Sequence, residues 1–83
     1  MDSAKEKILS LLAKEWESKG PPGIMDVGDI VSIISLAPSD SMETLRELFL
    51  SGLVDMTTFK TSAYLTPEGY EHIRPHLKRQ KEN

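Results

Sequence analysis

Residues 45–69 read LRELFLSGLVDMTTFKTSAYLTPEG, and this stretch decides which fold the chain can adopt. Its first part continues a set of apolar side chains that share one helix face, namely Met42, Leu45, Leu48 and Phe49. Gly52 follows this pattern, and glycine favours the left-handed turn that ends a helix because it has no Cβ to clash. We therefore predict a helix that ends at Gly52.

Two strand-like runs and a new helix start follow. The runs cover residues 53–56 and 63–65, and the mostly polar residues 57–62 separate them, which predicts a hairpin. Thr66 can cap the next helix with its hydroxyl, and Pro67 suits the first helical position, where its missing N–H costs nothing. Glu68 is favoured at the positive end of the helix dipole.

The pattern Leu45-x-x-Leu48-x-x-x-Gly52-Leu53-Val54, followed by Tyr64-Leu65-Thr66-Pro67-Glu68-Gly69, resembles the winged helix-turn-helix domains of small bacterial and archaeal transcription regulators. This resemblance implies an α+β, mainly helical fold: a three-helix core, a two-stranded β wing and a C-terminal helix. It covers nearly the whole chain. The same scaffold also serves in protein-interaction modules, so the fold alone leaves the function open.

Length and composition narrow the class of protein. Eighty-three residues suit a single winged-helix domain over 1–83, and the absence of cysteine excludes disulfides, thiol nucleophiles and thiolate metal sites. No apolar run approaches the ~20 residues that cross a bilayer, and the first residues lack the order of a signal peptide. We expect a cytoplasmic protein.

The net charge of −3 is unevenly distributed. Residues 25–54, which would form the helix-turn-helix, carry five acids and a single base, Arg46. Residues 74–81 carry four bases and no acid. Since Lys and Arg supply most of the non-specific affinity for DNA, this distribution is unfavourable for the helix-turn-helix and favourable for the tail.

The first helix is predicted from Ser3 to about Lys19, with Trp16 at the end of its apolar stripe, either as a core residue or as part of a partner surface. Residues 20–23, Gly-Pro-Pro-Gly, must end it. A short strand at Ile24 and Met25 and a second helix capped by Asp26 are expected next. In that helix Ile33 lies opposite the apolar stripe and is expected to be either exposed or covered by another surface.

The third helix should begin at Ser39 or Asp40, after Pro38. Its outward face is predicted to hold Asp40, Ser41, Glu43, Thr44 and Glu47, with Arg46 at the margin. On this face Ser41 and Thr44 can meet bases or phosphates, and Arg46 can bind guanine or phosphate. The three acids argue against ordinary reading of a DNA groove.

Lys60 is the charged residue at the wing tip and suits a phosphate contact, while Phe59 beside it either touches a partner or folds back on the core. Pro75 interrupts the last helix, so we expect that helix to kink or end near Arg74. The remaining residues, about 75–83, are expected to form a basic, flexible tail.

No enzyme, cofactor or metal site is expected. Glu68, His72 and His76 share a helical spacing that can bind zinc, but Pro75 disturbs the register and no third strong ligand follows. No Ser or Thr lies in a nucleophile elbow, and Gly20 and Gly23 lack the Lys-Ser/Thr of a phosphate loop.

Two functions remain. The first is a winged-helix, DNA-binding transcription regulator of prokaryotic type that acts as a dimer on double-stranded DNA through Ser39, Ser41, Thr44, Arg46, Lys60, Lys78 and Arg79. The alternative is a protein-interaction module without DNA binding, whose interface would include Asp40, Glu43, Glu47, Ile33, Trp16 and Phe59. Charge reversal at Glu43 and Glu47 should strengthen DNA binding in the first case and weaken a basic partner in the second.

Overall fold

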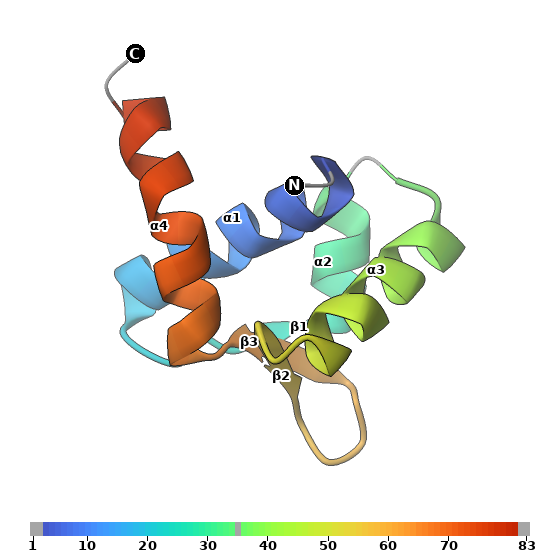
Figure 1. Cartoon of the computed structure of the whole chain (residues 1–83). Coiled ribbons are helices and arrows are strands. Elements are labelled where there is room, and N and C mark those ends of the chain that lie inside the picture. The colour runs from blue at the N-terminus through green and yellow to red at the C-terminus, as the bar shows by residue number, and fades with distance from the viewer. Residues whose placement is uncertain (1–2, 35, 82–83) are drawn as a thin grey trace.

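Four helices and a three-stranded sheet make up the part of the chain that the computed structural model describes, residues 3–34 and 36–81 (Figure 1). In chain order the elements are α1 (Ser3–Lys19), β1 (Met25–Asp26), α2 (Val27–Ile33), α3 (Pro38–Leu50), β2 (Val54–Met56), β3 (Ser62–Leu65) and α4 (Pro67–Lys81). This is the order predicted for a winged helix-turn-helix domain. In the described residues no helix is long and apolar enough to cross a membrane.

The sheet is antiparallel, and β3 lies between β1 and β2. Val54 pairs with Leu65 in the wing hairpin, and Met25 pairs with Ala63 on the other side of β3. The predicted hairpin is therefore confirmed. The first strand lies one residue later than expected, because Ile24 precedes the pairing and is 51% exposed.

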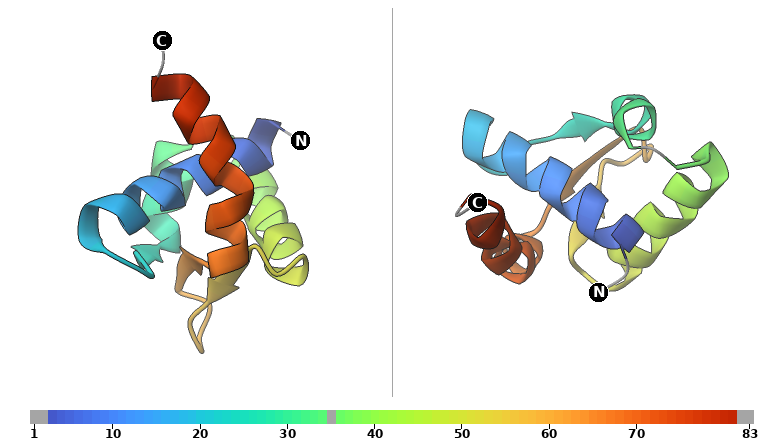
Figure 2. Two further views of the ribbon diagram at one scale, coloured as in Figure 1. Left: turned by 60° about the vertical axis from the view of Figure 1, so that its left-hand side comes forward. Right: turned by 90° about the horizontal axis from the view of Figure 1, so that it is seen from above.

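α1 is the central helix of the interior. It runs between α4 and α3 and contacts both, as the view from above in Figure 2 shows. Its bounds match the prediction, but its fully buried residues are Ile8, Leu9, Leu12 and Ala13. The buried residues form a wide stripe around Leu9, which is expected for a helix with neighbours on two sides.

The junction between α3, the wing and α4 is fixed by backbone hydrogen bonds. The Leu53 N–H donates to the Leu48 carbonyl (3.1 Å) and the Gly52 N–H to the Phe49 carbonyl (3.1 Å), while Gly52 has φ +79°. These bonds form the Schellman motif, in which glycine accepts the left-handed conformation. The predicted end of the third helix is confirmed.

Thr66 joins the start of α4 to the end of α3. Its Oγ1 accepts from the Gly69 N–H (3.0 Å) and donates to the Gly52 carbonyl (2.7 Å), so Thr66 caps α4 as predicted. Gly69 is buried against the Leu53 carbonyl, where a Cβ would overlap the oxygen. The wing is therefore held between the two helices that flank it.

α2 begins and faces the interior as predicted. The Asp26 carboxylate accepts from the Gly28 N–H (2.8 Å), which caps the helix, and Val27 and Ile30 are buried. Ile33 is 57% exposed.

Two helix ends differ from the positions named for them. α3 begins at Pro38 rather than at Ser39 or Asp40, with Pro38 in the first turn, where a missing N–H is tolerated. Of the two outcomes predicted at Pro75, a kink or an end of the helix, the end is wrong, because α4 continues through Pro75 to Lys81. Leu77 is buried and the His76 Nδ1 lies 3.5 Å from the Glu6 Oε1, so contacts with the rest of the protein support the turns around Pro75.

Candidate interaction groove between α3 and the wing

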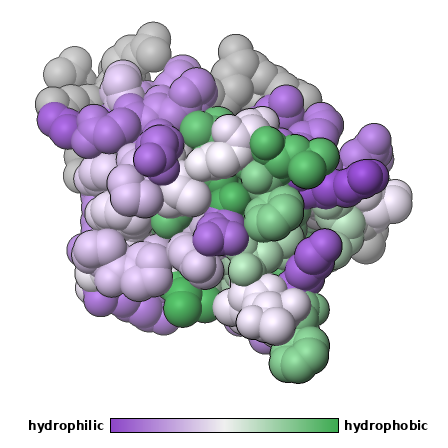
Figure 3. All heavy atoms as spheres, turned by 60° about the horizontal axis from the view of Figure 1, so that its bottom comes forward, coloured by the Kyte–Doolittle hydropathy of each residue, from purple (hydrophilic) through white to green (hydrophobic). Residues whose placement is uncertain are grey.

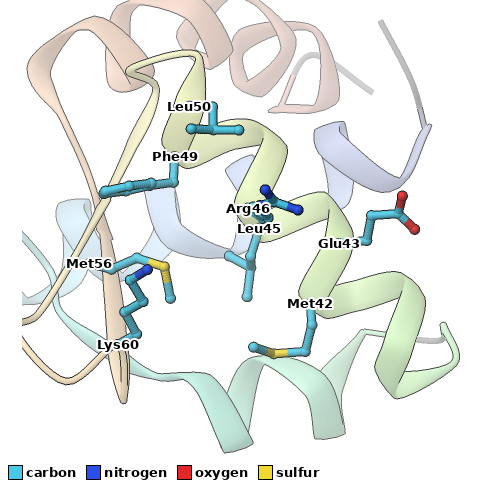
Figure 4. Close-up of a pocket in the computed structure, with 8 residues that line it drawn as sticks. All are labelled: Met42, Glu43, Leu45, Arg46, Phe49, Leu50, Met56 and Lys60. Atoms are coloured by element: carbon cyan, nitrogen blue, oxygen red, sulfur yellow. The ribbon is translucent and has the colours of Figure 1, made fainter.

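A groove of about 550 Å³ separates α3 from the wing. It is lined by Met42, Glu43, Leu45, Arg46, Phe49, Leu50, Met56 and Lys60, drawn in Figure 4. In Figure 3 hydrophobic side chains gather on this face of the molecule, with hydrophilic ones around them. This is the face on which the recognition helix and the wing of a winged-helix domain lie together.

The predicted outward face of α3 is partly wrong. Ser41 is fully buried and Thr44 is 8% exposed, whereas Met42 is 44% exposed. Leu45 and Leu48 are buried as expected, and the small side chains of Ser41 and Thr44 let α3 pack closely beside them. The Thr44 hydroxyl donates to the Asp40 carbonyl one turn earlier (2.8 Å). Ser41 and Thr44 are therefore not available for contact with DNA.

The groove has a cation on each wall. Arg46 is exposed on α3, and Lys60 is exposed on the wing with its Nζ 5.8 Å from the centre of the Phe49 ring. Glu43 also lines the groove, and its side chain points away from the wing in Figure 4. The lining therefore carries two cations and one carboxylate.

The wing tip is a tight turn. The Lys60 N–H donates to the Thr57 carbonyl (2.7 Å), and Lys60 itself has φ +57°, a conformation that costs energy for any residue except glycine. The Thr57 N–H donates to the Ser62 carbonyl (3.0 Å) at the base of the turn. Phe59 is 86% exposed, so of its two predicted positions the structure has the exposed one.

The acids on α3 have different surroundings. Glu47 lies 3.8 Å from the Lys5 Nζ of α1, in a partly exposed ion pair that compensates its charge. Asp40 is exposed in the first turn, where the helix dipole favours a carboxylate. Glu43 is exposed as well, and Ser39 beside Asp40 is exposed at the start of the helix.

The other predicted residues lie away from the groove or outside the description. The Trp16 ring stacks on Tyr70 of α4, with centroids 4.7 Å apart and planes 8° from parallel. Ile33 is exposed on α2. Lys78 and Arg79 belong to α4, and their side chains lie outside the described part of the chain.

Five groove residues were not singled out from the sequence as site residues: Met42, Leu45, Phe49, Leu50 and Met56. A usable signal was present, because Leu48, Phe49 and Leu50 are consecutive and a helix cannot turn three neighbouring side chains to one interior. Leu50 is 71% exposed as a result.

In residues 3–34 and 36–81 no three His, Asp or Glu side chains come together as metal ligands. Glu68 and His72 line a shallow hollow with Leu53, whereas His76 is directed to Glu6.

Comparison with known proteins gives matches in structure only. No protein-family model and no curated protein matches the chain. Solved structures that match over 99% of the chain include NadR in complex with 4-hydroxyphenylacetate (TM-score 0.78, 21% identity) and a variant of ZitR from Lactococcus lactis (TM-score 0.73, 20% identity). The chain spans 59% of that NadR chain and 54% of the ZitR chain. At this identity the likeness concerns the fold: the chain is a winged helix-turn-helix domain of the α+β, mainly helical class.

Proposed function

We propose that this chain is a DNA-binding domain of a prokaryotic-type transcription regulator, which acts in the cytoplasm and is not an enzyme. One observation carries the proposal: Arg46 on α3 and Lys60 on the wing stand on opposite walls of the same groove. A helix in the major groove and a hairpin along the adjacent backbone would bring both cations to the duplex. NadR and ZitR match the chain in fold, which is the fold that the resemblance to winged-helix transcription regulators implies.

In this proposal the residues have separate roles. Arg46 contacts guanine or phosphate, and Lys60 contacts phosphate from the wing tip. Ser39, exposed in the first turn of α3, donates its hydroxyl to a phosphate. Lys78 and Arg79 add charge from the end of α4, and two copies on one site compensate for the small number of cations in each.

The test is fluorescence anisotropy with a labelled pool of random-sequence duplexes at several salt concentrations. The double variant Arg46→Ala/Lys60→Ala is compared with Lys7→Ala/Lys14→Ala, which makes the same change in net charge at two exposed lysines of α1. Loss of two phosphate contacts lowers the magnitude of the log K against log salt slope by about 2. The α1 control should keep the slope, and an unchanged slope in the groove variant would refute the assignment.

A protein-interaction module is the second candidate, and the exposed acids Asp40 and Glu43 favour it because carboxylates repel a polyanion. Glu43→Lys separates the two functions. It should strengthen duplex binding if α3 faces DNA, and it should weaken binding of a basic protein partner if the acidic side of α3 is the interface. Glu43 is the better probe than Glu47, whose reversal would also disturb the Lys5 pair.

A further inference from the structure

The lining of the groove is more apolar than a duplex requires. Met42 is 44% exposed and Leu50 is 71% exposed, while Phe49 on α3 and Met56 on β2 are partly buried. The apolar group that DNA presents in its major groove is the thymine methyl. Methionine, aromatic residues and arginine are the side chains that protein interfaces favour, and all three line this groove.

The charged residues at the rim of the groove indicate which charge a binding partner would carry. Arg46 and Lys60 border the apolar surface and outnumber Glu43, the single acid of the lining, whose side chain points away from the wing in Figure 4. An apolar side chain that enters the groove would therefore bring its neighbours close to two cations.

We propose that the α3–wing groove also binds a short protein segment in which a large apolar side chain stands beside Asp or Glu. The apolar side chain would contact Met42, Leu50 and Met56, and the carboxylate would pair with Arg46 or Lys60. This inference goes beyond DNA binding, and because both ligands use one face, the segment excludes DNA. Such a segment is a means of switching a regulator off.

The experiment selects binders from a phage-displayed library of random 12-residue peptides on the wild-type protein. Clones that also bind the variant Met42→Gln/Leu50→Gln are discarded. Both substitutions are at exposed positions, so the variant should fold, and its thermal unfolding is compared with that of the wild type. The selected clones should carry Leu, Met, Phe or Trp beside Asp or Glu.

Synthetic copies of the selected peptides then test whether binding depends on the positive charge of the groove and whether the peptides bind in the groove. Lys60→Glu should weaken them at least tenfold, and Lys14→Glu on α1 should change their affinity by less than twofold. The inference is overturned if no clone depends on Met42 and Leu50, or if the clones are basic or uncharged. It is also overturned if the groove is occupied by a second copy, seen as a concentration-dependent dimer that Leu50→Gln abolishes.

Failure of this inference and failure of the proposed function are distinguishable. Leu50→Gln removes no charge, so it should reduce peptide binding at least fivefold and leave duplex affinity within twofold. If the protein binds the peptides but no duplex, the inference holds and the proposed DNA function is wrong. If it binds a duplex that the peptides do not displace, the two ligands do not share one face.

Discussion

The two sides of this molecule differ in how far their large side chains are covered by other residues of the chain. Where α1 meets α4, Trp16 stacks on Tyr70, and the Tyr70 Oη donates to the Glu17 Oε2 at 2.9 Å. This hydrogen bond, together with partial burial, raises the pKa of Tyr70. Where α3 meets the wing, Leu50 and Met42 are left in water. One side is closed by the chain's own residues, and the other is left open, as a binding face must be.

The largest expected difference between the two sides is in stability. Leu12→Ala removes a fully buried side chain of α1 and should lower the free energy of unfolding by about 3 kcal/mol. Leu50→Ala makes the same chemical change in the groove, where the side chain is 71% exposed, and should change it by less than about 0.5 kcal/mol. Urea denaturation measures both. Equal losses would mean that the groove is part of the core.

The junction that holds the wing beside α3 should be the next most sensitive place. Gly69→Ala places a Cβ against the Leu53 carbonyl, which belongs to the backbone and cannot move aside easily, so a loss of about 2 kcal/mol is expected. Gly28→Ala, at an exposed position in α2, is the control and should stay within about 1 kcal/mol of the wild type. A fully stable Gly69→Ala protein would contradict this packing of α4.

The stack on the closed side can be measured as a coupling energy. A double-mutant cycle with Trp16→Ala and Tyr70→Ala should give about 1 kcal/mol of interaction, the value typical of paired aromatic rings. Phe59→Ala, at the exposed wing tip, should have almost no effect on stability. A coupling energy of zero would show that Trp16 and Tyr70 do not pack on each other in solution.

The smallest expected effect separates charge from conformation at the wing tip. Lys60→Gly removes the strain of the positive φ, which stabilises the folded protein, but it also raises the conformational entropy of the unfolded chain, which opposes folding. The difference of the two effects should be a gain in stability of about 0.5 kcal/mol. The same variant should still show a weaker salt dependence of duplex binding, because it lacks the charge of Lys60. Lys60→Ala keeps the strain and loses the charge, and a thermal melt of both variants distinguishes the two contributions.

The sequence predicted the parts of the fold that depend on local chemistry. Gly52, Thr66 and Pro67 are residues with specific backbone roles, and each has the expected role in the structure. The sequence left open whether α4 kinks or ends at Pro75, because the cost of Pro75 is local, while the burial of Leu77 beyond it depends on distant residues.

The candidate site was less accessible to sequence reasoning. α3 has apolar residues on more than one side, so periodicity could not decide which side is buried, and Ser41 and Thr44 were assigned to the wrong one. Packing against α1 and α2 decides that question, and it involves residues far away in the chain. The positions of Arg46 and Lys60, set by the helix and the hairpin turn, agree with the expected exposure.

We infer that the open α3–wing side is the face that binds a ligand. It is tested most directly by an amide chemical-shift titration of the labelled protein with pooled random-sequence duplexes, at low salt and near physiological salt. We expect shifts at Ser39, Arg46 and Lys60 that weaken with salt. Shifts confined to α1 and α4, or none at all, would contradict it.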